Sequence, residues 1–308
     1  MKSNGIVLEH IDCEQCGSHR KQKLFVVADP FSVTDEEYTL VRCCDCGLIY
    51  VNPRPTEETI GLCYPRTYYD AHVSHFRDEQ TKLVCIEMRR LCDISRFSKP
   101  GHILDVGCGN GRFLSVAKKN GWRTLGIEIS HDMADFARNE YGLDIIEKGL
   151  SEAELPSDEF DVVTMWGVLE HLHHPKSALM EVNRVLRPGG LLVVLAPNID
   201  STQFKLFGPK WPLLDVPRHL YQFSKTSLRR MVTGAGFVSV WGRFYAPEHD
   251  LGNLIKSLEA ILIRKDRLSN RNIARIAMGL ARRLSPIISR LMAVGQRSAA
   301  MEMYFIKR

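Results

Sequence analysis

The stretch Gly-His-Ile-Leu-Asp-Val-Gly-Cys-Gly-Asn-Gly-Arg, residues 101–112, indicates the fold of this chain. A short apolar run with one acid, Asp105, is typical of a buried strand, and three glycines follow it at alternate positions. Glycine is needed in such a turn because a Cβ atom would keep a ligand away from the backbone amides. From Phe113 onward the chain can form a helix. A strand, a glycine-rich turn and a helix N-terminus predict a nucleotide-binding α/β fold.

The spacing of the glycines and of two acids narrows the choice of ligand. Dinucleotide-binding chains typically read G-x-G-x-x-G, whereas this chain reads Gly107-x-Gly109-x-Gly111. Asp105 beside the turn favours a ligand with an ammonium group over one with a pyrophosphate. Glu128, at the expected end of the next strand, can accept hydrogen bonds from both hydroxyls of a ribose. The alternative is a glycine-rich turn with an ordinary surface acid.

The rest of the core alternates strands and helices, which predicts a parallel sheet. Further strands are expected at 143–147, 160–166 and 191–195, and helices at 130–141 and 175–187. A Pro-Gly-Gly sequence ends the second of these helices.

Several of these segments resemble class I S-adenosylmethionine-dependent methyltransferases. Besides the glycine turn and Glu128, they are the Phe-Asp-x-Val strand at 160–163, the Leu-Glu-His turn at 169–171 and the Leu-Arg-Pro-Gly-Gly break at 186–190. The resemblance covers residues 99–245. It implies a Rossmann-like seven-stranded methyltransferase sheet, mostly parallel, whose last strand is antiparallel and lies near 299–307.

The same resemblance implies S-adenosylmethionine as cofactor and a set of residues around it. The adenine contact stays open, because many relatives have an acid in the turn after the third strand and the nearest candidates here are Glu152 and Glu154. The expected cofactor-binding residues are Asp105, Gly107, Gly109, Gly111, Glu128, Ile129, Leu150 and Trp166.

Two Cys-x-x-Cys-Gly knuckles near the N-terminus predict a metal site. Two such knuckles can offer four thiolates to one tetrahedral ion, and a closed four-sulfur site is structural, which favours zinc. The expected ligands are Cys13, Cys16, Cys43 and Cys46. The alternative is a redox dithiol. The residues between the knuckles mix positive and negative charges, so they do not favour nucleic acid as a partner.

The ribbon and its exit sequence, Cys-Gly-Leu-Ile-Tyr-Val-Asn-Pro-Arg-Pro at 46–55, resemble a methyltransferase subgroup linked with sugars and cell-surface polysaccharide precursors. The resemblance therefore implies O-methylation of a saccharide or other small-molecule acceptor by in-line methyl transfer. Two alternatives stay open. One is a nucleic-acid (RNA) methyltransferase that uses the ribbon and basic helices for binding. The other is a non-catalytic scaffold with the cofactor fold.

A long segment after the fifth strand, residues 197–224, is the expected substrate region, because long irregular loops tend to be functional. Histidine is suited to remove a proton from a hydroxyl near neutral pH, and His219 is favoured for this over His171. Arg218 is expected to bind an anionic substrate group such as a phosphate, and Tyr221 to line the same site. The alternative for His171 is that it only holds its loop.

Two further segments allow two interpretations each. Tyrosines at 64–70 predict either a lid over the site or aromatic packing. A helix at 78–97 is expected to cover the sheet with an apolar stripe of Leu83, Val84, Ile86, Leu91 and Ile94. The segment 251–298 predicts basic amphipathic helices, which form either a cap or dimer surface, or a contact with an anionic membrane surface.

The composition sets the remaining expectations. The chain has 308 residues, nine cysteines and a net charge of +5, and it has no apolar run of the length that spans a membrane. Unpaired cysteines and the lack of an apolar leader favour the cytoplasm, at the membrane periphery if the basic helices bind lipid. The oligomeric state stays open. The expected parts are a zinc ribbon at 1–55, a linker with covering helices at 56–98, a methyltransferase core at 99–250, a basic helical insertion at 251–298 and a final strand at 299–308.

Overall fold

The computed structural model describes residues 5–30, 33–34, 36–64, 80–245, 250–255, 257 and 271–308. The predicted tyrosine lid, apart from Tyr64, and residues 258–270 of the basic insertion lie outside this part. The chain forms two compact units. Unit 1 comprises Met1–Cys63, Ala196–Leu228 and Gly242–Glu302, and unit 2 comprises Tyr64–Leu195, Arg229–Trp241 and Met303–Arg308.

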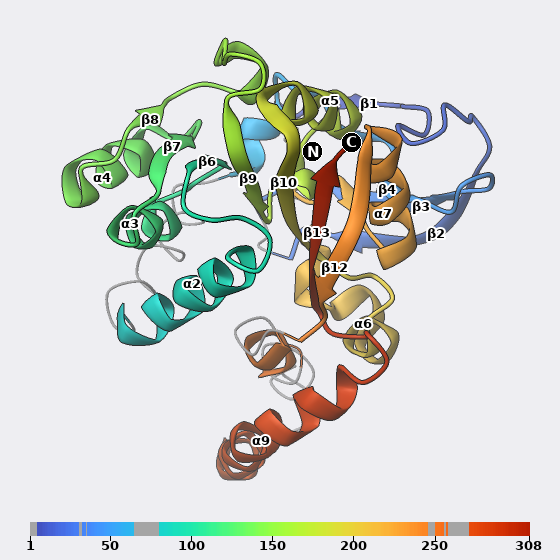
Figure 1. The fold of residues 1–308 in the computed structure, drawn as a ribbon. Coiled ribbons are helices and arrows are strands. Elements are labelled where there is room, and N and C mark those ends of the chain that lie inside the picture. Colours follow the sequence, from blue (N-terminus) through green and yellow to red (C-terminus); the bar gives the residue numbers. More distant parts are fainter. Residues whose placement is uncertain are drawn as a thin grey trace. The chain divides into compact units, whose positions relative to one another are not determined.

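Most of a seven-stranded sheet belongs to unit 2. Its strands follow the order β12-β13-β10-β9-β6-β7-β8 (Figure 1). The five strands from β10 to β8 in this order pair in parallel, and β13 runs the opposite way, as the family resemblance implies. The strands are β6 (His102–Val106), β7 (Arg123–Ile127), β8 (Ile145–Ile146), β9 (Phe160–Trp166), β10 (Leu186–Pro197), β12 (Phe237–Arg243) and β13 (Ala300–Lys307).

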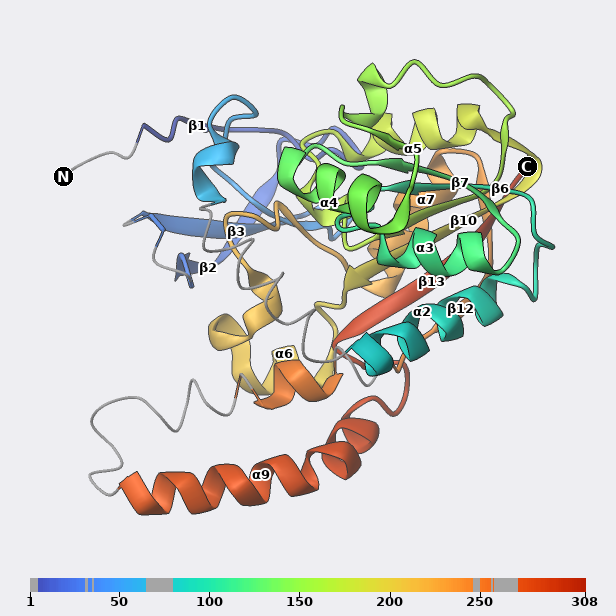
Figure 2. The ribbon, with the colours of Figure 1, turned by 90° about the vertical axis from the view of Figure 1, so that its left-hand side faces the viewer.

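Helices cover both faces of this sheet. Figure 2 shows α5 on the opposite side of the strands from α2 and α3. Apolar residues of α2, α3 and α4 join those of the sheet in one buried cluster, which fixes the strands and hence their carboxyl ends. The helices are α2 (Gln80–Ile94), α3 (Arg112–Lys119), α4 (His131–Tyr141), α5 (Pro175–Val185) and α7 (Lys225–Gly234), with short 3₁₀ turns η2 (Leu150–Glu152) and η3 (Leu169–His171).

Three details differ from the sequence prediction. Val84, expected on the buried stripe of the 78–97 helix, is exposed, whereas Leu91 and Ile94 are buried. The third strand is shorter than 143–147. The Pro-Gly-Gly sequence does not separate α5 from the next strand, because β10 already begins at Leu186 and passes through a bulge before Leu191. Glycines permit this bulge, since a Cβ at Gly190 would lie 2.8 Å from a backbone oxygen.

Unit 1 contains a second, four-stranded sheet in the order β11-β4-β3-β2. The strands β2 (Lys21–Ala28), β3 (Glu37–Cys43) and β4 (Ile49–Val51) pair antiparallel, and β1 (Leu8–Glu9) pairs with β5 (Arg54–Pro55). The fourth strand, β11 (Tyr221–Gln222), comes from the predicted substrate region and pairs with β4. The sequence does not predict this pairing, because two residues give too short an alternation to identify a strand.

The rest of the 197–224 segment also packs into unit 1. Trp211, Leu214 and Val216 are buried in one apolar cluster with residues of β2, β3 and β4. Unit 1 further contains η1 (Ile60–Cys63), α6 (Thr202–Phe207), η4 (Gly208–Lys210), η5 (Pro212–Leu214) and α9 (Arg271–Met292). Among the described residues, no helix combines the length and apolar character needed to cross a bilayer.

Candidate functional site

The glycine-rich turn follows β6 and leads into α3. Gly107, Gly109 and Gly111 have φ angles of 67°, 53° and 73°, in the left-handed region that favours glycine. A Cβ would lie 2.7 Å from Val168 Cγ2 at the first glycine and 2.5 Å from Leu143 Cδ1 at the third. At Gly109 a Cβ would meet nothing within 4 Å. Packing within unit 2 thus requires two of the glycines, and a ligand can approach the backbone at the middle one.

Glu128 follows β7 and lies beside this turn. Its Oε2 accepts a hydrogen bond from the Gly109 amide, and its Oε1 accepts one from the Ser130 amide, each at 2.8 Å. These bonds hold the carboxylate in a fixed orientation. Because an ionised carboxylate has about four acceptor positions, it can also accept from two ribose hydroxyls.

Asp105 is buried near the end of β6, and its Oδ1 accepts a hydrogen bond from Thr164 Oγ1 at 2.6 Å. Burial raises the pKa of Asp105 to about 8. A cation bound beside it would lower this pKa and restore the charge. The site therefore fits a ligand that brings its own positive group.

The other expected cofactor residues lie along the same edge of the sheet in unit 2. Trp166 ends β9, with its ring centroid 5.2 Å from that of Phe113 and 4.3 Å from the guanidinium carbon of Arg90. Leu150 begins η2 and is half-buried, whereas Ile129 is exposed. Ligands of open α/β sheets bind at this carboxyl edge.

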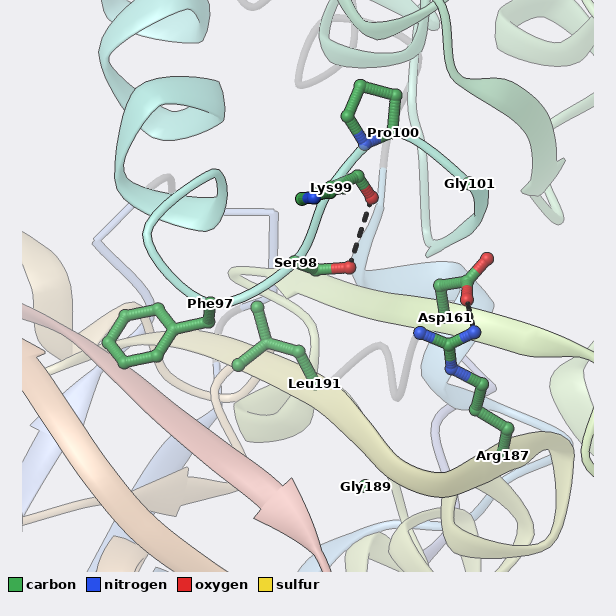
Figure 3. A pocket seen from close by; sticks show the side chains of 9 residues that line it. All are labelled: Phe97, Ser98, Lys99, Pro100, Gly101, Asp161, Arg187, Gly189 and Leu191. Atoms are coloured by element: carbon green, nitrogen blue, oxygen red, sulfur yellow. Dashed lines mark hydrogen bonds and ion pairs between the residues drawn. The ribbon is translucent and has the colours of Figure 1, made fainter.

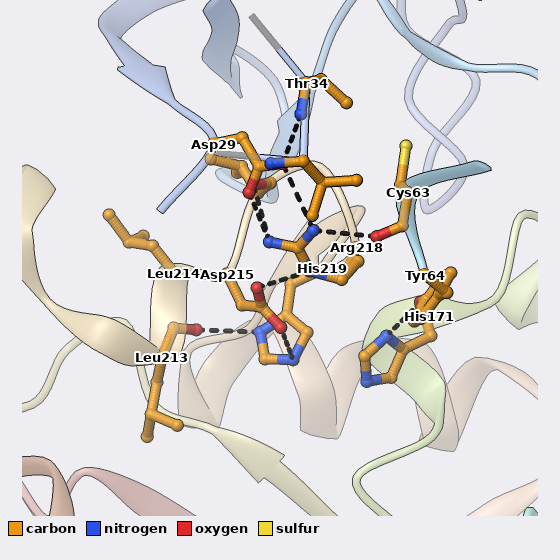
Figure 4. Close-up of polar contacts among 12 residues, drawn as sticks. Asp29, Thr34, Cys63, Tyr64, His171, Leu213, Leu214, Asp215, Arg218 and His219 are labelled. Carbon is orange, nitrogen blue, oxygen red and sulfur yellow. Dashed lines mark hydrogen bonds and ion pairs between the residues drawn. The ribbon is translucent and has the colours of Figure 1, made fainter. Parts of the chain in front are cut away.

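His171 ends the η3 turn that follows β9, so it too belongs to this edge. Its Nδ1 lies 2.9 Å from the hydroxyl oxygen of Tyr64, and the side chain is half-buried (Figure 4). The turn is held near the glycines through the contact between Val168 and Gly107. The sequence predicts Tyr64 in a lid or a packing cluster, and no local pattern indicates His171 as its partner, because the two residues are far apart in the chain.

His219, the favoured general base, is buried in unit 1. Its Nδ1 lies 2.8 Å from the carbonyl oxygen of Leu213, which can only accept, so this nitrogen carries a proton (Figure 4). Burial lowers the pKa of His219 to about 4. The imidazole is therefore neutral at pH 7 and a weak base.

Arg218 is fully buried, and its geometry does not support the expected role of binding a substrate anion. Its Nη2 lies 2.6 Å from Asp29 Oδ1, its Nε 2.8 Å from Asp215 Oδ1, and its Nη1 donates to the carbonyl oxygen of Cys63 (Figure 4). Two carboxylates of the protein thus balance its charge. Within unit 1, Arg218 connects the turn after β2, which carries Asp29, with the end of η1 and with the 211–222 segment.

Tyr221, expected to line the substrate site, is buried as well. Its hydroxyl oxygen accepts a hydrogen bond from Arg54 Nη1 at 2.9 Å, and Arg54 Nε lies 2.8 Å from Glu9 Oε1. Tyr221 thus belongs to the pairing of β11 with β4, and its hydroxyl is bonded to Arg54. Composition alone could not show this, since polar side chains in a loop suggest a site and a buried network equally well.

The four cysteines of the two knuckles meet in unit 1. Their sulfurs lie within 4.8 Å of one another, with Cys13–Cys46 at 3.4 Å and Cys16–Cys43 at 3.5 Å. Tetrahedral zinc with Zn–S bonds of about 2.3 Å needs sulfurs about 3.8 Å apart, so the cluster is compatible with zinc. The exposed Cys44 is not part of it.

The knuckles are built alike. In each knuckle, the amide of the first cysteine donates a hydrogen bond to the carbonyl oxygen five residues later, from Cys13 to Ser18 and from Cys43 to Leu48. The glycine after each pair, Gly17 or Gly47, has a left-handed backbone conformation, and its amide donates a hydrogen bond to the carbonyl oxygen of the first cysteine.

A hollow of about 440 Å³ in unit 2 lies at the amino ends of the strands, away from the glycine turn. Figure 3 shows Asp161 and Arg187 paired across it, with Ser98 and Lys99 on the chain that leads to β6. The Asp161 carboxylate also accepts a hydrogen bond from the His102 amide. This hollow is therefore separate from the cofactor candidates.

The chain is similar to known proteins in sequence and in fold. A sequence model of a family described as a methyltransferase domain matches residues 76–240, more than half of the chain. A ubiquinone biosynthesis O-methyltransferase from Maricaulis maris is 32% identical over 131 residues, which are 40% of this chain and 52% of the relative. A probable S-adenosylmethionine-dependent methyltransferase from Mycolicibacterium smegmatis is 30% identical over 136 residues, 44% of this chain and 51% of the relative. The chain spans about half the length of these curated relatives.

Solved structures show the same fold. A SAM-dependent methyltransferase from Archaeoglobus fulgidus superposes with a TM-score of 0.53 at 20% identity, covering 78% of this chain and all of its own. A possible histamine N-methyltransferase from Thermotoga maritima gives 0.52 at 18% identity, covering 80% of this chain and 98% of its own. These structural similarities support the assignment of the fold alone.

Proposed function

Since this chain belongs to the family of methyltransferase domains, we propose that it transfers a methyl group from S-adenosylmethionine to a hydroxyl of a small molecule. The observation that carries the proposal is the arrangement of Asp105, Gly109 and Glu128 at one edge of the sheet. A buried acid that needs a cation, an approachable backbone and an oriented carboxylate suit the amino acid and ribose parts of this cofactor.

Each group then has a distinct task. Asp105 would hold the ammonium group, Glu128 would accept hydrogen bonds from the ribose hydroxyls, and Ile129, Leu150 and Trp166 would line the rest of the cofactor site. When bound, S-adenosylmethionine supplies an electrophilic methyl group. The protein has to align the acceptor oxygen with it, which can lower the barrier by several kcal/mol.

His171 is the general base in this proposal. It follows β9 at the edge that carries the glycine turn, and its bond with Tyr64 orients the ring. His171 is half-buried, whereas His219 is buried and its pKa is lowered to about 4 by that burial. His171 would accept the proton of the acceptor hydroxyl.

We propose a saccharide or another small hydroxyl compound as the acceptor. The support for oxygen as the methylated atom is the likeness to relatives named as ubiquinone biosynthesis O-methyltransferases. The support for a saccharide is the cysteine ribbon with its exit sequence, which resembles the sugar-linked subgroup.

We further propose that the cysteine cluster holds a structural zinc ion. Four thiolates close the coordination sphere, so no position is left for a substrate. Zinc would link the chain before β2 with the turn between β3 and β4, and would add folding free energy to a unit with small sheets.

The test is transfer of labelled methyl from S-adenosylmethionine into separated pools of nucleotide sugars, lipid-linked saccharides and RNA. We expect alkali-stable label in a saccharide pool. His171→Ala should lower the rate at least a hundredfold with little change in cofactor affinity. His131→Gln, on the exposed start of α4, is the matched control. Label in RNA, or full activity of His171→Ala, would contradict the proposal.

A further inference from the structure

The C-terminal half of α9 carries its apolar side chains on the outside. Leu284, Ile287 and Leu291 are 43%, 62% and 67% exposed. On the other side of the helix, Ser285 and Ser289 are 2% and 0% exposed. A surface helix usually buries its apolar stripe and exposes its polar face, so this helix is inverted.

The exposed side chains form one continuous stripe. Positions 284, 287, 288 and 291 follow one another at three- and four-residue spacing, which places them on one face of a helix. Val294, 68% exposed, follows just beyond its end. In the sequence, Ile273, Ile276 and Leu280 precede Leu284 at the same spacing.

The inward face is firmly attached to the rest of unit 1. Thr202 Oγ1 of α6 donates a hydrogen bond to the carbonyl oxygen of Met292 at 2.7 Å. Ala293, directly after the helix, is also buried. If the helical repeat is continued to this residue, it lies on the same side as the two serines. The serine face therefore cannot exchange places with the apolar face without breaking these contacts.

The charge of the segment indicates what binds the stripe. Residues 271–297 contain six arginines and no aspartate, glutamate or lysine. Arg283 and Arg290 are exposed, and their positions, seven residues apart, place both along one border of the stripe. An apolar stripe bordered by arginines matches the acyl boundary and headgroups of an anionic lipid surface.

We infer that α9 is a membrane-docking helix that lies flat on an anionic bilayer, with Leu284, Ile287 and Leu291 inserted among the acyl chains. The arginines then contact lipid phosphates. A protein partner or a second copy of the chain would also cover apolar residues, but neither would need a run of arginines without any acid.

The full chain is tested by co-sedimentation with vesicles of phosphatidylcholine alone and of phosphatidylcholine with 30% phosphatidylglycerol. We expect binding to the anionic vesicles that weakens when salt rises, because salt screens the arginines. Arg283→Gln/Arg290→Gln should weaken it about 20- to 30-fold. Lys148→Gln/Lys176→Gln, which removes two exposed charges elsewhere, should leave it unchanged.

The apolar part has its own variant. Ile287→Gln/Leu291→Gln should weaken anionic binding at least tenfold while the melting temperature stays the same, because both side chains are exposed. Met180→Gln, at an exposed apolar residue of α5, is the control. Three results would overturn the inference. They are an equal loss of vesicle binding with the arginine and the lysine variants, no vesicle binding at low salt, and a lipid-free dimer that Ile287→Gln/Leu291→Gln converts to a monomer.

Discussion

The pKa of Asp105 gives a quantitative prediction for cofactor binding. Burial holds the pKa of this carboxyl at about 8, so it is protonated in the free protein at pH 6 to 7. An ammonium group needs the ionised form as its partner, so binding must expel the proton. Below the free-state pKa, each unit of pH then costs about 1.4 kcal/mol, which is a tenfold change in affinity. The Kd for S-adenosylmethionine should fall about tenfold per unit between pH 6 and 7, and level off near pH 8.

Isothermal titration calorimetry in two buffers of different ionisation enthalpy measures both the Kd and the protons released. We expect about one proton per bound cofactor at pH 6.5. Asp105→Asn should bind more weakly and lose both the pH dependence and the proton release. Asp144→Asn, an exposed acid before β8, should behave like the unaltered protein. A Kd that does not change from pH 6 to 7, or an equal slope in Asp105→Asn, would refute the reasoning.

Three further predictions concern unit 1. Cys46→Ser should lose the one zinc expected per chain and lower the melting temperature, whereas the exposed Cys44→Ser should keep both, as metal analysis and calorimetry can show. Arg218→Met should destabilise the protein by about 3–5 kcal/mol because it removes the cation that two buried carboxylates share, against about 0–1 kcal/mol for Arg184→Met on the surface of α5, measured by urea unfolding. Because the folded state holds the pKa of His219 near 4, below its usual 6.5, the stability that this residue contributes is full above pH 6.5 and is lost as pH falls toward 4. His219→Gln should flatten the fall of melting temperature over that range.

The part of the fold that the sequence predicts best is the part built from local patterns. The glycine turn, β6, β7, β9 and their helices follow from apolar runs, caps and glycines within a few residues of one another. The sequence predicts that Pro-Gly-Gly separates a helix from the next strand, but in the structure it forms a bulge within β10. Local sequence preference could not distinguish a break from a bulge, because the difference lies in the pairing of β10 with β9, which continues on both sides of the Pro-Gly-Gly sequence.

The residues of the predicted substrate region show where sequence reasoning stops. Arg218 and Tyr221 have the chemistry of a binding site, yet each bonds a group distant in sequence, Asp29 and Arg54. Such pairs depend on how the 211–222 segment adds β11 to the four-stranded sheet of unit 1. No spacing rule reveals that contact. The same holds for the bond between Tyr64 and His171.

The measurement that tests the central claim most directly is calorimetric titration of the zinc-loaded chain with S-adenosylmethionine and with its demethylated product at pH 7.5. Glu128→Ala is the test variant, and Glu140→Ala, on the exposed side of α4, is its control. We predict micromolar binding of both compounds that disappears in Glu128→Ala and persists in Glu140→Ala. Absence of binding by the folded protein, or undiminished binding by Glu128→Ala, would contradict the assignment of this edge of the sheet as the cofactor site.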